Sequence, residues 1–377
     1  MEDAAPRPTA VVHDQVPFLQ YPSPHKDDAN RRQYLIYLIP GNPGLVGYYV
    51  PFMTTLRQLL NETESTQGSR DSFHIYGRNL LGFDDRDHQP LFGTSTSAAN
   101  ASGDAKKTEP FNLDDQINGV CENVRKVATS TLANGRVFDH VILIGHSVGA
   151  YIALETFHRH LQDKQTTRSS EIPNPTLAPL SQVSLTSGIL LFPTVYHIAR
   201  SPSGRKLDLL RTIGVLDRTA HHLARYALDV LPGWAVSGVV RRVLGFPEHA
   251  ADATLGFLNG RDGVWQALHL GKDEMKVIGE EKWAEEVWEI QEAEGKQPGA
   301  GPKQGESPAK FYFYFGTKDH WVADECRDEF IERRRQHEKG RTRVVIDEGG
   351  VPHAFCIHHS ESVAEKVRSW VEGIAGL

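Results

Sequence analysis

A serine lies between two glycines in the sequence Gly145-His146-Ser147-Val148-Gly149. A serine hydroxyl can attack a carbonyl carbon once a neighbouring base takes its proton. The apolar run 141–144 precedes this pentapeptide, and a helix-forming run, 150–155, follows it. This order predicts a strand, a strained turn and a helix, with the Ser147 hydroxyl raised at the carboxyl end of the strand. The alternative is an ordinary glycine-rich turn in which Ser147 only caps the helix.

A nucleophilic serine needs a base, and in this strand–turn–helix arrangement the base is a histidine that follows the serine and an acid along the chain. The chain has 18 histidines, so their position must decide. His353 lies in a loop after the last predicted strand and before the C-terminal helix, and we predict that it is the base. His358 and His359 are close in sequence but fall at or inside the start of that helix.

The base in turn needs a carboxylate that orients its ring. Asp319 follows the apolar run 311–315 and precedes His353, so we predict that it has this role. Asp324 and Asp347 are alternatives, but Asp324 falls in the next predicted helix and Asp347 in or near the last strand. His320 either lines the mouth of the site or is a surface histidine.

Acyl transfer also needs hydrogen-bond donors for the oxygen that becomes negatively charged. One predicted donor is the backbone N–H of Val148, directly after the serine. The second should come from a loop after an early strand, and Pro40-Gly41-Asn42-Pro43-Gly44 occupies that place. Since proline has no N–H, Asn42 is the better candidate. The alternative is a plain turn.

The elements that must position these residues are apolar, β-branched or aromatic runs that end in loops. They fall within 34–44, 73–83, 140–161, 183–195, 311–321 and 343–355. Helical patterns lie between them, within 48–60 and 111–132, and a last one covers 360–376. Strands that alternate with helices predict an α/β fold with a mostly parallel sheet covered on both faces.

The chain divides into four predicted parts. They are a lead-in (1–33), the first part of the α/β core (34–195), an inserted helical cap (196–300) and the second part of the core (301–377). In the cap, Leu209, Ile213 and Leu216 have helical spacing. The stretches 84–110 and 162–182 are polar and 294–308 is rich in Gly and Pro, which is typical of insertions and linkers.

Composition excludes several classes of function. The formal net charge is -7 and the pI is about 6.2, which argues against nucleic acid as a partner. The three cysteines are widely spaced and form no zinc pattern, so we expect no metal or other cofactor and a reducing compartment. We find no signal-peptide pattern and no apolar run long enough to span a membrane.

Five segments together resemble one known family, the lipid droplet-associated hydrolases. They are LIPGNPGLVGYYVPF (38–52), IGHSVGAYIALE (144–155), LLFPTV (190–195), GTKDHW (316–321) and VPHAF (351–355). The resemblance implies an α/β-hydrolase fold with Ser147, Asp319 and His353 as its catalytic triad. It also implies a lipid ester as substrate, such as a sterol ester or triacylglycerol, a role in lipid storage, and peripheral attachment to lipid droplets and the endoplasmic reticulum.

The predicted cap contains an apolar segment, 231–246, with a basic pair. One hypothesis is that it lies in a lipid surface, with Trp234 and Phe246 buried and Arg241 and Arg242 near head groups. The alternative is a cap helix packed over the sheet. For the whole chain, the leading hypothesis is a serine hydrolase of lipid esters. The rivals are a binding or tethering protein of lipid droplets and an acyltransferase.

Overall fold

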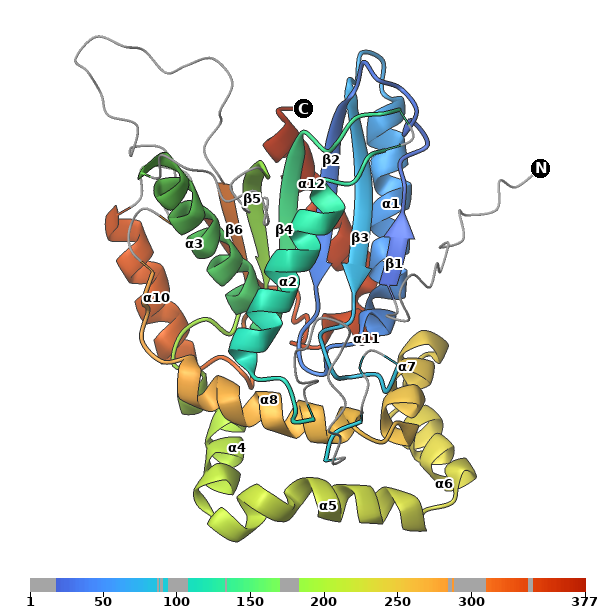
Figure 1. Ribbon diagram of the computed structural model, residues 1–377, viewed down its shortest axis with the longest axis vertical. Coiled ribbons are helices and arrows are strands. Elements are labelled where there is room, and N and C mark those ends of the chain that lie inside the picture. Colours follow the sequence, from blue (N-terminus) through green and yellow to red (C-terminus); the bar gives the residue numbers. More distant parts are fainter. Residues whose placement is uncertain are drawn as a thin grey trace.

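A seven-stranded sheet forms the centre of the protein, in the order β1-β3-β2-β4-β5-β6-β7 (Figure 1). The computed structural model describes residues 18–86, 88, 91–93, 108–132, 134–169, 183–283, 287, 310–337 and 342–377. The strands are β1 (Phe18–Tyr21), β2 (Arg32–Ile39), β3 (Asp71–Arg78), β4 (His140–His146), β5 (Leu185–Leu191), β6 (Lys310–Gly316) and β7 (Thr342–Asp347). Neighbouring strands are parallel, except that β1 is antiparallel to β3. The predicted α/β class is thus confirmed.

Helices cover both faces of the sheet (Figure 1). The described helices outside the cap are η1 (Val46–Tyr49), α1 (Val50–Ser65), α2 (Leu113–Ala128), α3 (Val148–Ser169), α10 (Asp324–His337), α11 (Phe355–His358) and α12 (Ser360–Ala375). In Figure 1, α2 and α3 lie in front of the sheet, whereas α1 and α12 pack together behind it. Parallel strands need such cover on both faces because their backbone and side chains are otherwise open to water.

The aromatic run of β6 shows how the sequence fits both layers. Successive side chains of a strand point to opposite faces. Phe311 packs against Phe157 of α3, with ring centroids 5.0 Å apart. The next residue, Tyr312, stacks instead on Trp370 of α12 at 5.5 Å. This alternation places apolar surface against helices on both sides, which explains why the strand has no polar face.

A helical cap is inserted between β5 and β6. Its described elements are η3 (Ile198–Arg200), α4 (Pro202–Thr212), α5 (Gly214–Val230), α6 (Gly233–Gly238), η4 (Val239–Val243), α7 (Glu248–Asn259) and α8 (Gly263–Val277). They lie below the carboxyl ends of the parallel strands (Figure 1). Helical spacing indicated the region of α4 and α5, but it did not find the break at Ile213, whose extended backbone separates these two helices.

The structure differs from the predicted boundaries at the amino end. Residues 18–21 of the predicted lead-in form β1, and Phe18 stacks on Tyr76 of β3 with centroids 5.3 Å apart. A four-residue edge strand is too short for a clear alternating pattern. The predicted linker 294–308 lies outside the described residues, as do most of the two polar stretches. Among the described helices, none combines the length and apolar character that crossing a bilayer requires.

A buried carboxylate joins the end of α1 to the edge of the sheet. Glu64 accepts hydrogen bonds from Arg57 Nη2 at 2.7 Å, the backbone N–H of Phe73 at 2.7 Å and the hydroxyl of Ser23 at 2.8 Å. Both members of the Arg57–Glu64 ion pair are buried. Removal of one partner would leave an unpaired charge inside the protein.

We expect Glu64→Ala to lower the free energy of unfolding by about 3–5 kcal/mol, the usual cost of breaking a buried ion pair. Glu62→Ala is the control, since Glu62 is an exposed acid on the same helix that pairs with Arg368. The control should change stability by about 1 kcal/mol or less. Urea unfolding followed by fluorescence measures both, and equal losses in the two variants would contradict this account.

Candidate active site

Ser147 lies in a tight turn between β4 and α3. Its φ angle is 55°, in the left-handed region that L-residues rarely adopt. A Cβ at Gly145 would lie 2.3 Å from the carbonyl oxygen of Gly149, and one at Gly149 would lie 2.3 Å from that of Ile39. Both positions therefore require glycine. The turn also places Ser147 at the amino end of α3, where the helix dipole favours negative charge.

Three side chains from different loops form a hydrogen-bonded chain. Asp319 Oδ2 lies 2.7 Å from His353 Nδ1, and His353 Nε2 lies 2.9 Å from Ser147 Oγ. Since a carboxylate only accepts, Nδ1 carries the ring proton and Nε2 accepts from the serine hydroxyl. The structure thus brings together the residues that the sequence singled out as nucleophile, base and acid.

Asp319 is held as a charged group in a buried place. Its other oxygen, Oδ1, accepts a hydrogen bond from the Trp321 backbone N–H at 2.8 Å. Burial by itself would raise the pKa of Asp319, but the hydrogen bonds from His353 and Trp321 outweigh it and hold the pKa below its usual value. A carboxylate that stays ionised can stabilise the positive imidazolium that forms when His353 takes a proton.

The alternative acids lie elsewhere. Asp347 accepts from the Tyr314 hydroxyl at 2.6 Å and the Val351 backbone N–H at 2.7 Å, so it supports the start of the loop that carries His353. Asp324 lies in the first turn of α10 and pairs with Arg327 at 2.8 Å.

The alternative bases, His358 and His359, are not part of the hydrogen-bonded chain at Ser147. His358 is exposed at the end of α11, and His359 is the N-cap residue of α12. His320 is exposed, and its ring centroid lies 5.9 Å from that of His353. Its position beside the histidine ring is compatible with the mouth of the site.

The loop that contains Asn42 lies against the nucleophile. A Cβ at Gly41 would be 3.0 Å from the Cβ of Ser147. The Asn42–Pro43 peptide bond is cis. Val148 is the buried first residue of α3, and the first backbone N–H groups of a helix have no partner within it. Both predicted donors therefore come from segments that meet at Ser147.

A buried Tyr–His pair, which the sequence analysis did not single out, links the three loops. His146 Nδ1 lies 2.6 Å from the Tyr49 hydroxyl, which accepts from the Gly41 backbone N–H at 2.9 Å. On the other side, His146 Nε2 lies 2.9 Å from the backbone carbonyl of His353. This carbonyl only accepts, so Nε2 carries the proton and Nδ1 accepts from Tyr49.

His146 is neutral in this network. Burial lowers the pKa of His146 to about 3, with a smaller contribution from His353. Its ring also makes edge contacts with Phe355 and Phe192. His146 and Tyr49 both lie inside motifs that the sequence analysis quoted. The sequence does not show that they pair, because they are 97 residues apart.

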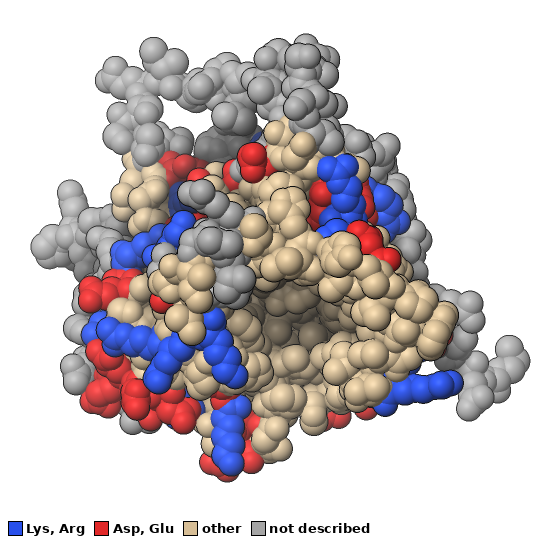
Figure 2. Space-filling view, turned by 90° about the horizontal axis from the view of Figure 1, so that it is seen from below, with Lys and Arg blue, Asp and Glu red and all other residues tan. Residues whose placement is uncertain are grey.

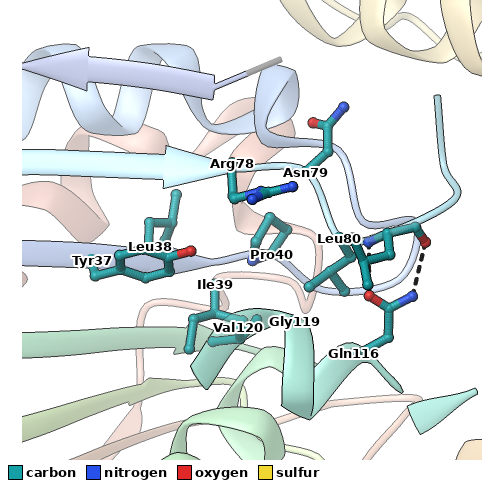
Figure 3. Close-up of a pocket in the computed structure, with 11 residues that line it drawn as sticks. Tyr37, Leu38, Ile39, Pro40, Arg78, Asn79, Leu80, Gln116, Gly119 and Val120 are labelled. Atoms are coloured by element: carbon teal, nitrogen blue, oxygen red, sulfur yellow. Dashed lines mark hydrogen bonds between the residues drawn. The ribbon is translucent and has the colours of Figure 1, made fainter. Parts of the chain in front are cut away.

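A small pocket lies beside the start of the loop that carries Asn42, between β2, β3 and α2 (Figure 3). Its lining includes Tyr37, Pro40, Arg78, Leu80, Gln116 and Val120. At one side of the pocket, the Gln116 side chain accepts from the backbone N–H of Leu81 at 2.7 Å and donates to the carbonyl of Leu81 at 2.8 Å. The interior has room for about one water molecule, so it does not accommodate an acyl chain.

The cap exposes an unusual amount of apolar surface. Ten large hydrophobic side chains between residues 209 and 244, which we call the outer cap surface, are exposed: Leu209, Ile213, Leu223, Tyr226, Val230, Leu231, Trp234, Val239, Val243 and Leu244. Figure 2 views the cap from below and shows a hollow bordered by uncharged residues, with charged side chains towards the edges. Exposed apolar patches of this kind mark sites that contact other molecules or membranes.

The four cap residues that were predicted to contact lipid differ in their exposure. Trp234 is 80% exposed, and Arg242 is exposed. Arg241 is half-exposed and pairs with Asp252 of α7. Phe246 is half-buried and packs against the hydrophobic core, so it has less surface available to a lipid than Trp234 has. It follows Gly245, whose φ is 66°.

Comparison with solved structures identifies the fold. A peroxisomal α/β-hydrolase of Saccharomyces cerevisiae is similar over 100% of this chain and 87% of the yeast chain, with a TM-score of 0.55 and 11% sequence identity. The strand order and the turn at Ser147 agree with that fold. The predicted α/β-hydrolase fold is therefore confirmed.

Comparison with characterised sequences identifies the family. The lipid droplet-associated hydrolases of Mus musculus and Gallus gallus are 24% and 25% identical to this chain, and each alignment covers 92% of this chain and 87% of the relative. The family model for lipid-droplet associated hydrolases matches residues 32–356, from the start of β2 to α11. This chain therefore belongs to the lipid droplet-associated hydrolase family, as its sequence motifs predicted.

Proposed function

We propose that this hydrolase cleaves carboxylic esters of lipids, with Ser147 as nucleophile, His353 as base and Asp319 as the residue that orients the base. The observation that carries the proposal is the unbroken chain of hydrogen bonds from Asp319 through His353 to Ser147, at 2.7 and 2.9 Å. These distances allow direct proton transfer between the serine and the imidazole. No metal or cofactor is needed for this chemistry.

In the first step the serine becomes acylated. His353 Nε2 takes the hydroxyl proton while Ser147 Oγ forms a bond to the carbonyl carbon of the ester. The carbonyl oxygen becomes negatively charged, and the backbone N–H groups of Val148 and Asn42 donate to it. When this intermediate collapses, the bond to the alcohol oxygen breaks and His353 returns the proton to that oxygen.

In the second step water releases the acyl group. His353 takes a proton from a water molecule, whose oxygen bonds to the acyl carbon of the acyl-enzyme. The bond to Ser147 Oγ then breaks, and the proton passes from His353 back to the serine. The net reaction is ester plus water giving a carboxylic acid and an alcohol. An acyltransferase would differ only in the acceptor that takes the place of water.

A lipid is the proposed substrate class for two reasons. The relatives in mouse and chicken are named lipid droplet-associated hydrolases. The outer cap surface also supports this proposal, because its ten apolar side chains would lose contact with water if they entered a lipid monolayer. Sterol esters and triacylglycerol are the substrates we propose to test first. Association with the endoplasmic reticulum stays a prediction from the resemblance.

The same surface favours one alternative function. A protein that only binds or tethers lipid droplets would need the outer cap surface but not the chain of hydrogen bonds at Ser147. The glycine-dependent strain at Ser147 favours an enzyme, because strained backbone persists mainly where function uses it. The experiments below separate the two functions.

We expect the purified protein to react with a fluorophosphonate probe and to hydrolyse lipid esters, and Ser147→Ala to do neither. The reason is that the substitution removes the attacking oxygen. The measurement is in-gel fluorescence beside a panel of sterol esters, acylglycerols and short-chain esters. Binding to droplets by both proteins, with no label and no hydrolysis in either, would instead support the tethering function.

Asp319→Asn should reduce kcat by roughly 10³- to 10⁴-fold with little change in KM, because the amide can no longer fix the tautomer of His353. Asp324→Asn is the matched control, since Asp324 pairs with Arg327 on the surface. Steady-state kinetics on a soluble short-chain ester measures both variants. Similar rates for the two would show that Asp319 is not the orienting acid.

The double variant Trp234→Asp/Val243→Asp should bind phospholipid-coated triolein droplets at least roughly 10-fold more weakly, because each buried apolar side chain contributes about 1.5–3 kcal/mol. Hydrolysis of a soluble ester should not change. Val137→Asp is the control, since Val137 is exposed before β4, at the opposite end of the sheet. Flotation of droplets measures binding. Unchanged flotation of the double variant would refute a role of this surface in binding lipid.

A further inference from the structure

One face of cap helix α8 holds the loop that carries Asn42. The side-chain amide of Asn42 donates to the backbone carbonyl of Ala267 at 3.0 Å and to Glu274 Oε1 at 3.1 Å. Between them, a Cβ at Gly271 would lie 3.5 Å from Asn42 Nδ2. Residues 267, 271 and 274 have the i, i+4, i+7 spacing of one helix face. The contact joins segments more than 220 residues apart.

Glu274 is an acid in an unusual environment. It is 4% exposed, and its described side-chain partner is the uncharged amide of Asn42. Burial raises the pKa of Glu274 to about 8, the hydrogen bond from Asn42 opposes this rise, and the neighbouring Asp273 adds to it. At neutral pH the carboxyl group therefore mostly keeps its proton, and its carbonyl oxygen still accepts from Asn42.

We propose that Glu274 is a positioning residue that, together with the Ala267 carbonyl, fixes the Asn42 side chain and thereby holds the Asn42 backbone N–H in the oxyanion hole. This inference rests on the proposed function, because it assigns that N–H to the oxygen of the tetrahedral intermediate. Two hydrogen bonds to one side-chain amide leave the residue little freedom to rotate. The cap then forms part of the active site as well as its cover.

The charged groups near Glu274 affect the pH at which its carboxyl group loses its proton. Asp273, on the same helix, accepts from the Leu113 backbone N–H of α2 at 2.9 Å and is the charged neighbour that acts on Glu274. The elements packed against α8 carry further titratable groups whose described contacts are with residues other than Glu274. They are Asp115 in the capping box of α2, Arg205 of α4 on the Arg200 carbonyl, His221 of α5 stacked on Trp265 of α8, and Asp252 of α7 with Arg241. Loss of the Glu274 proton would therefore place a second negative charge next to that of Asp273 and beside the proposed oxyanion hole.

The geometry gives an expected size for the effect. Removal of one oxyanion donor usually costs 10²- to 10³-fold in kcat. Loss of the Glu274 carboxyl displaces a donor without removing it, so Glu274→Ala should lower kcat by about 10- to 100-fold with little change in KM. Glu274→Gln should restore most of this activity, because the glutamine side chain has the shape and hydrogen-bonding groups of a protonated glutamic acid.

The pH profile separates positioning from a merely structural role. Wild-type kcat should fall above pH 8, because a buried carboxylate would repel the oxyanion. In Glu274→Gln this alkaline fall should be absent. Asp273→Asn is the matched control on the same helix. It should keep the fall and move it to lower pH, because it removes a neighbouring charge that raises the pKa of Glu274.

Thermal unfolding gives a readout that does not depend on catalysis. The folded protein keeps the Glu274 proton to about pH 8, whereas the unfolded chain releases it near pH 4.5. The folded state binds more protons in this window, so wild-type stability should decrease from pH 4.5 to 8 relative to Glu274→Gln. Parallel pH curves for the two proteins would overturn the assignment of a neutral Glu274.

The outcomes distinguish this inference from the proposed function. If wild type hydrolyses esters through Ser147 but Glu274→Ala has normal kcat, the positioning role is wrong and the proposed function stands. The same holds if Glu274→Gln keeps the alkaline fall. If wild type shows no Ser147-dependent hydrolysis, the proposed function fails and the positioning role fails with it, even where the unfolding curves show a neutral Glu274.

Discussion

The site depends on one close contact between two pieces of backbone. The turn after β4 passes so near the end of β2 that a Cβ at Gly149 would lie 2.3 Å from the Ile39 carbonyl and 2.6 Å from that of Pro40. This contact holds the nucleophile turn directly against the loop that begins at Pro40. Because both segments leave neighbouring parallel strands at the same edge, the sheet itself sets the distance between the serine and the oxyanion loop.

The remaining groups reach that edge through the other strands. Asp319 follows β6, and His353 follows β7, so each loop begins at the carboxyl end of a parallel strand. A loop alone would not hold a side chain to within a few tenths of an ångström. The Tyr49–His146 pair supplies part of the missing rigidity, because it bonds the oxyanion loop on one side and the backbone of the histidine loop on the other. Because the pKa of His146 is about 3, its ring stays neutral and in one tautomer at pH values well above 3.

The sequence predicted those parts of the site whose signals are local. Ser147, Asp319 and His353 each follow a recognisable strand. The two glycines around Ser147 belong to the recognised motif, and the structure shows that a side chain at either position would clash with backbone. It did not predict partners that depend on how distant segments meet. Asn42 and Glu274 are 232 residues apart, and nothing in either neighbourhood indicates the other. The edge strand β1 was missed for a different reason, because four residues carry too little periodicity.

Periodicity indicated helices in the cap, but it did not show which of their side chains are buried. Helical spacing of apolar residues usually indicates a face packed on a core. Here Leu209 and Ile213 have that spacing yet are exposed, while the acidic residue Glu274 is buried on α8. The cap thus exposes apolar side chains and buries an acidic one, the reverse of an ordinary surface layer. The helix that bonds Asn42 and the helices that expose apolar side chains therefore belong to one insertion. A displacement of α8 would therefore alter the contacts of Asn42, and α8 in turn packs against α4 and α5, which carry part of the exposed apolar surface.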